Sequence, residues 1–161
     1  ILKDGSLDFP KSVLSRLDLI IGSVHSAFTQ EKDVMTNRIV KAIRSGCIDI
    51  IAHPTGRVIG KRPGYDVDMD TIISEATKHN VALEINAYPE RMDLDSKWAK
   101  KAMEAGAYIA INTDSHNTNE LQFMSYGLDI ARRAWLESPC VINTWPLDKL
   151  QGWLKSRPMR S

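Results

Sequence analysis

Short apolar runs alternate along this chain with longer stretches in which apolar residues recur at helical spacing. The apolar runs have the length of β-strands and occupy residues 19–24, 48–52, 81–85 and 107–111. Because they are almost continuously apolar, they are typical of strands covered on both faces, as in parallel sheets. The helical patterns occupy residues 32–45, 69–79, 96–105, 128–136 and 146–155. This alternation predicts an α/β fold.

Capping residues support the ends of the predicted helices. Gly46 and Gly106 follow two of them and can adopt the left-handed conformation that closes a helix. Ser96 is the expected N-cap of the helix over 96–105, and Pro146 suits the first turn of the last helix. Strands and helices alternate in units of roughly 30 residues, which is the length of one βα step.

Size and composition fit one soluble globular domain over residues 1–155, followed by a frayed tail at 156–161. Of the 161 residues, 43% are hydrophobic and 25% are charged, which is enough for a core. The net charge of +1 provides no general attraction to nucleic acid, so such binding would need a local basic patch. Because no apolar run approaches the roughly 20 residues that span a bilayer, no membrane partner is expected.

Two further features concern the setting of the chain. Its first residue is Ile rather than Met, so we expect it to begin within a longer gene product. Cys47 and Cys140 lie among apolar neighbours and outside any Cys-x-x-Cys pair, which argues against a thiolate zinc site. We expect both to be buried free thiols of a cytoplasmic protein.

Residue types that ligate metals stand just past three of the apolar runs. His25 follows the first run, His53 the second, and Asp114 and His116 the fourth. In a parallel α/β sheet these points lie on one rim, where barrel enzymes collect their chemistry. Imidazole and carboxylate together suit Zn, Mn or Fe. The sequence therefore predicts a metal site at this rim.

Each of these residues also has a structural interpretation. His25 or His53 taken singly is more often a buried histidine bonded to backbone, and Asp114 with His116 could equally form a turn with an exposed imidazole. Because three such explanations would have to coincide, the metal site is favoured. We expect Pro54 to hold His53 extended. His79 breaks the pattern, because it stands at a helix end, and is excluded.

The loop after His53 is basic. It carries Arg57, Lys61 and Arg62 within a glycine-containing stretch. An arginine fork matches phosphate oxygens, so we predict that this loop contacts phosphate or nucleic acid. A solvated surface loop is the alternative interpretation.

A second rim loop follows the third apolar run. Asn86 at its start could orient the substrate or bond a ligand, whereas Glu90, Arg91 and Asp93 are expected only to pair at the surface. No Ser-His-Asp order, Walker loop or Gly-x-Gly-x-x-Gly motif occurs, which argues against acyl transfer, P-loop and dinucleotide chemistry.

Taken together, these segments resemble the PHP domain of bacterial and archaeal family X DNA polymerases. The resemblance covers nearly the whole chain. Its most specific part is His-Pro-Thr-Gly-Arg at 53–57 with Arg-Pro-Gly-Tyr at 62–65, which separates it from histidinol-phosphatase-like relatives. The other similar segments are 1–8, 23–25, 84–86, 113–116, 124–127, 131–135 and 141–146.

This resemblance implies a distorted seven-stranded (β/α) barrel that holds up to three Mn, Zn or Fe ions on its rim. His25 and His53 match family ligands that share one ion. Asp114 and His116 match ligands that reach the others, and we assign them catalytic roles as well. The implied activity is that of a 3′–5′ exonuclease or 3′-end phosphoesterase acting on DNA ends.

The chain also departs from the family pattern. Family members begin the site with a His-x-His strand and further ligands, and no His-x-His occurs in these 161 residues. We therefore expect the C-terminal part of a PHP barrel, with its first strands missing, impaired catalysis and an exposed sheet edge through which a dimer could form. The alternatives are a non-catalytic structural or interaction module and a small-molecule phosphatase of the same superfamily.

Overall fold

A parallel β-sheet forms the centre of the molecule, as the apolar runs predict. The computed structural model describes residues 1–156. Within them, four strands follow one another in the order β1-β2-β3-β4, and all three neighbouring pairs are parallel. The strands are β1 (Ile21–Gly22), β2 (Ile50–Ile51), β3 (Ala82–Asn86) and β4 (Ile109–Asn112). The predicted α/β class is confirmed.

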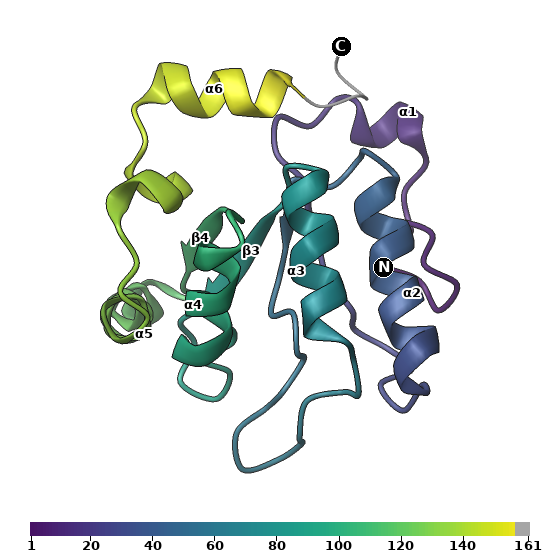
Figure 1. Ribbon diagram of the computed structural model, residues 1–161, viewed down its shortest axis with the longest axis horizontal. Coiled ribbons are helices and arrows are strands. Elements are labelled where there is room, and N and C mark those ends of the chain that lie inside the picture. Colours follow the sequence, from purple (N-terminus) through teal and green to yellow (C-terminus); the bar gives the residue numbers. More distant parts are fainter. Residues whose placement is uncertain (157–161) are drawn as a thin grey trace.

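Helices connect the strands and cover one face of the sheet. Figure 1 shows α2, α3 and α4 side by side on that face, while α6 lies across the end of the sheet where the strands begin. The helices of the described residues are α1 (Lys11–Leu14), α2 (Lys32–Arg44), α3 (Met69–Lys78), α4 (Ser96–Glu104), α5 (Met124–Arg133) and α6 (Leu147–Lys155). None of them is long and apolar enough to cross a membrane.

The two faces of the sheet have different surroundings. Side chains that alternate along the strands, such as Leu83, Ile85 and Ile109, belong to the main core. Their neighbours Ala82 and Ala110 point to the opposite face and belong to a smaller cluster. That cluster also contains Ile50, Ile142 and Trp153. Because β3 alternates between the two faces, Glu84 and Asn86 share the face of Ala82.

The two edges of the sheet also differ. Next to β4, the side chain of Asn143 pairs with the backbone of Ile111 in place of a neighbouring strand. Its Oδ1 accepts from the backbone N–H of Ile111 (2.8 Å), and its Nδ2 donates to the Ile111 carbonyl (3.0 Å). Val141 forms a parallel bridge with Ile109 on the same edge. β1 is the other edge, where Ile21 is 48% exposed. Of the two edges, β1 is therefore the open one in the part of the chain that is described.

Several predicted boundaries need correction. α4 is capped by Asp95, whose side chain accepts from the N–H of Trp98, so Ser96 is its first helical residue rather than its N-cap. α5 begins at Met124, before the predicted start at 128, because Gly127 packs within it: a Cβ there would lie 2.5 Å from Ile111 Cγ2. Cys140 is half-buried rather than buried. Residues 157–161 of the predicted tail lie outside the described residues.

Candidate metal centre

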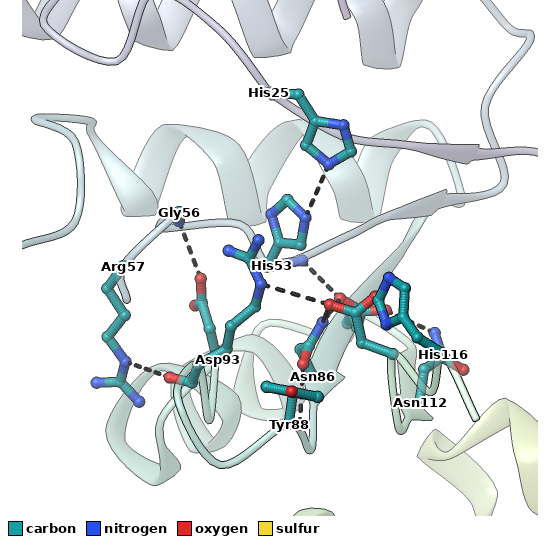
Figure 2. A network of polar contacts seen from close by, with 12 residues as sticks. His25, His53, Gly56, Arg57, Asn86, Tyr88, Asp93, Asn112 and His116 are labelled. Atoms are coloured by element: carbon teal, nitrogen blue, oxygen red, sulfur yellow. Dashed lines mark hydrogen bonds and ion pairs between the residues drawn. The ribbon is translucent and has the colours of Figure 1, made fainter. Parts of the chain in front are cut away.

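Two of the predicted ligands face each other at the carboxyl end of the sheet. His25 follows β1 and His53 follows β2, and their Nε2 atoms are 3.3 Å apart. Their rings are stacked, with centroids 5.3 Å apart. Figure 2 shows the two imidazoles pointing toward one another from separate segments of the chain. The parallel register of β1 and β2 explains this meeting, because it ends both strands at the same level.

The surroundings of both imidazoles favour the neutral form. His53 is only 4% exposed, and its burial, reinforced by the positive charge of Arg91, lowers its pKa to about 4. Burial also lowers the pKa of His25, again with a contribution from Arg91. Neutral imidazoles offer a lone pair on nitrogen, which is the form that binds metal ions.

The spacing of the pair fits a shared metal ion. Two nitrogens that each lie about 2.0–2.1 Å from a tetrahedral ion are about 3.3–3.4 Å from each other. The observed separation of the two Nε2 atoms is 3.3 Å. Without an ion, this contact requires that one imidazole donate its Nε2–H to the other. His53 and His25 are therefore placed as two ligands of one ion would be.

Backbone strain occurs at two of the predicted ligands. His53 has a φ of +32° and Asp114 a φ of +54°, whereas residues other than glycine rarely adopt positive values. The prediction that Pro54 holds His53 extended is wrong. The chain turns at once instead, because the His53 carbonyl accepts from the N–H of Gly56 (2.9 Å). Such residues cost of order 1–3 kcal/mol each and cluster at functional sites.

A buried carboxylate that the sequence interpretation missed lies beneath this rim. Glu84, on β3, is 3% exposed, and its Oε2 accepts from the backbone N–H of His53 (2.7 Å) and from Asn86 Nδ2 (3.2 Å). Its Oε1 accepts from Asn112 Nδ2 (2.8 Å). Burial raises the pKa of Glu84, and these three donors oppose the rise. The signal that could have found it is the two-residue alternation of β3, which places a charge on the face of Ala82.

Asp114 and His116 lie apart from the histidine pair. Asp114 Oδ2 accepts from Asn86 Nδ2 (3.1 Å) and pairs with Arg91 Nε (3.4 Å). The His116 side chain is 78% exposed and lies 3.9 Å from Glu120. Both residues line one depression together with Tyr88 and Arg91.

His25, by contrast, lines a separate depression along β1. In residues 1–156, no group of three or more His, Cys, Asp or Glu side chains is placed to hold a metal ion. The four predicted ligands therefore divide into the His25–His53 pair and two residues that line another depression.

The basic loop is held mainly by other parts of the protein. Arg57 donates from Nε to the Arg91 carbonyl (2.8 Å) and from Nη2 to the Met92 carbonyl. Lys61 pairs with Glu90 at 2.8 Å on the surface. Arg62 donates to the Gly56 carbonyl (2.7 Å) and stacks on the ring of Phe28. Arg57 and Arg62 thus hold loop backbone.

The second rim loop does more than pair at the surface. Asp93 is fully buried and accepts from the backbone N–H groups of Thr55 (3.0 Å) and Gly56 (2.9 Å), so the expectation of surface pairing is wrong for it. Arg91 contacts Asp114, and its buried Nη1 has no hydrogen-bond partner among the described residues. Glu90 does pair at the surface, with Lys61. Asp93 therefore fastens the loop that follows His53 to the loop that carries Arg91.

Comparison with known proteins places the chain in a family. No family model matches it. Over 155 residues it is 44% identical to the DNA polymerase/3′-5′ exonuclease PolX of Bacillus subtilis (strain 168), and the match covers 96% of this chain. The chain belongs to the PHP domain family as found in PolX. It spans 27% of the length of that PolX.

Other relatives of this PHP chain carry phosphatase names. A probable phosphatase of Thermoanaerobacter sp. (strain X514) is 28% identical over 164 residues, which cover 96% of this chain and 64% of the relative. A probable phosphatase of Aliivibrio fischeri (strain MJ11) is 34% identical over 125 residues, which cover 72% of this chain and 48% of the relative. These names support a hydrolase of the phosphoesterase type.

Proposed function

We propose that this PHP chain carries part of the active site of a metal-dependent phosphoesterase, and that in the whole protein the site acts on the 3′ ends of DNA. The observation that carries the proposal is the His25–His53 pair, whose 3.3 Å Nε2–Nε2 separation fits one shared ion. The name of the Bacillus subtilis relative, a 3′-5′ exonuclease, supports the choice of substrate. In this proposal the four strands form one side of a distorted seven-stranded barrel, and the whole protein supplies the rest.

The metal would supply the Lewis-acid chemistry. A Zn, Mn or Fe ion would draw charge from the phosphoryl oxygens and activate water. His25 and His53 would hold one ion, and Asp114 and His116 would reach up to two more in an intact domain. Asp114 would have to exchange its contact with Arg91 for a metal contact, since it now lies 3.4 Å from Arg91 Nε.

In this proposal Arg91 contacts the substrate's phosphate. Its Nη1 is buried without a partner in the described chain, and its side chain lines the same depression as Asp114 and His116. A guanidinium is a group that proteins use to bind phosphate oxygens. In this proposal Arg91 takes the part that the sequence assigned to Arg57, while Asn86 orients Asp114.

Metal binding and cleavage test the proposal separately. Elemental analysis of the purified chain should find Zn, Mn or Fe, and His53→Ala should lose it, whereas His79→Ala should retain it because His79 contacts Glu75 on α3 instead. In the whole protein, Asp114→Ala and His116→Ala should abolish metal-dependent release of nucleotides from a labelled oligonucleotide. A chain without metal, together with unchanged cleavage in these variants, would favour the non-catalytic module.

A small-molecule phosphatase is the second candidate. The names of the Thermoanaerobacter and Aliivibrio relatives favour it, since both are probable phosphatases. Hydrolysis of p-nitrophenyl phosphate without any action on DNA ends would select this candidate. The reverse pattern would select the DNA 3′ end.

A further inference from the structure

One carboxylate connects three elements at the rim. The donors to Glu84 come from the residues after β2, from the end of β3 and from the end of β4, namely His53, Asn86 and Asn112. In Figure 2, Asn86 and Asn112 lie below the imidazole of His53. Pairing of β3 with β4 sets Asn86 opposite Asn112, so both amides reach the same side chain. Glu84 is therefore the point at which three rim segments are fastened together.

We propose that Glu84 is the positioning residue of this site: it fixes His53 against His25 and, through Asn86, fixes Asp114. The inference rests on the proposed metal site, which it deepens by naming the group that builds it. Glu84 makes its contacts through the His53 backbone and two amides, so it acts through other residues rather than on the metal. Such supporting contacts determine how well ligands are oriented for metal binding.

The link to Asp114 runs through the Asn86 amide. Asn86 Nδ2 donates to Glu84 Oε2 and also to Asp114 Oδ2, at 3.2 and 3.1 Å. The amide orientation is fixed from its other end, because Asn86 Oδ1 accepts from the backbone N–H of Tyr88 (3.0 Å). A change at Glu84 is therefore transmitted to Asp114 as well as to His53.

Only a carboxylate of this length meets all three donors. Glutamate offers two acceptor oxygens, and here Oε2 accepts two hydrogen bonds and Oε1 accepts one. In Glu84→Gln, one oxygen becomes an NH₂ group that faces either the N–H of His53 or the NH₂ of Asn112. Two donors then oppose each other in a buried place, which forces the segments apart. The substitution changes hydrogen bonding while leaving side-chain volume nearly constant.

A matched control exists in the same protein. Glu75, on α3, is also a buried glutamate, with 7% of its side chain exposed, but it pairs with Arg44 and Lys78. Glu75→Gln removes a buried carboxylate of equal size without touching the rim. It should lower stability and leave the site intact.

The first measurement is metal affinity. Titration calorimetry with Zn²⁺ should show about 10- to 100-fold weaker binding for Glu84→Gln than for the wild type, and no change for Glu75→Gln. Asn112→Ala removes one donor but keeps the carboxylate, and should weaken binding by about 10-fold. If Glu84→Gln does not fold, Asn112→Ala decides. Unchanged affinity in the folded variants would overturn the proposal.

The second measurement needs no metal. In the metal-free chain, nuclear Overhauser effects should connect the His25 and His53 ring protons, because the rings are in contact. They should disappear in Glu84→Gln and persist in Glu75→Gln. If the wild type binds no Zn²⁺, the proposed function fails, and this measurement alone decides the role of Glu84. Ring contacts that persist in Glu84→Gln would refute that role.

Discussion

Gly56, in the loop after His53, allows a sharp test of how this loop is packed. Its φ is +64°, and a Cβ built on it would lie 2.1 Å from Cε1 of the buried Tyr65. Gly56→Ala therefore meets two costs. The left-handed backbone disfavours alanine by about 1–2 kcal/mol, and overpacking against Tyr65 adds about 1–3 kcal/mol. The expected loss of unfolding free energy is about 2–5 kcal/mol.

Gly60 in the same loop separates the two costs. Its φ is +74°, but a Cβ there has no heavy atom within 4 Å. Gly60→Ala should therefore meet only the backbone cost, about 1–2 kcal/mol. For a domain of this size, each kcal/mol lowers Tm by roughly 2–4 °C.

Differential scanning calorimetry should accordingly show a drop of about 2–8 °C for Gly60→Ala and of about 4–20 °C for Gly56→Ala. The difference between the variants reports the contact with Tyr65. Equal drops in the two variants would refute the steric argument. A larger loss in Gly60→Ala would show that the loop is not packed as described.

Two further predictions concern protonation and assembly. Burial raises the pKa of Asp93 to about 6 from 3.8, so the folded state holds its proton more tightly, and Asp93 favours folding most below pH 3.8. Stability relative to Asp93→Asn should therefore fall by about 2 kcal/mol as pH rises from 4 to 7 in urea unfolding; a constant difference would contradict this. Because β1 is the open edge, we also expect a dimer through it. Sedimentation should show that dimer, and Ile21→Lys, which places a charge on the edge, should shift it to monomer; a clean wild-type monomer would exclude it.

The hydrophobic pattern predicted the elements well because burial on both faces leaves a direct trace in composition. The apolar runs predict the strands that end before His25 and His53, and the common rim of a parallel sheet accounts for the 3.3 Å contact between these two residues. Gly127 shows where the pattern was insufficient. The pattern predicts a helix that starts at 128, yet Gly127 lies within α5 because the helix packs closely on β4.

The supporting contacts of the site could not be predicted from local sequence. Glu84 stands in an apolar run, and only the pairing of β3 with its neighbours gives it three donors from segments 2 to 31 positions away. The guanidinium of Arg57 is chemically suited to bind phosphate. In the structure it instead donates hydrogen bonds to two backbone carbonyls of a loop distant in sequence. The left-handed conformation of His53 likewise results from tertiary contacts that outweigh the extended preference of a residue before proline.

Because side chains alternate strictly along β3, the strand cannot gain or lose one residue without disrupting both faces of the sheet. Leu83 and Ile85 face the helices, while Glu84 and Asn86 face the rim network. Losing or gaining a single residue in this strand would exchange the two sets of side chains. A leucine would then contact the amides of the rim, and a carboxylate would enter the hydrophobic core beneath α3. Related chains that keep this network must therefore conserve the residue count of this strand.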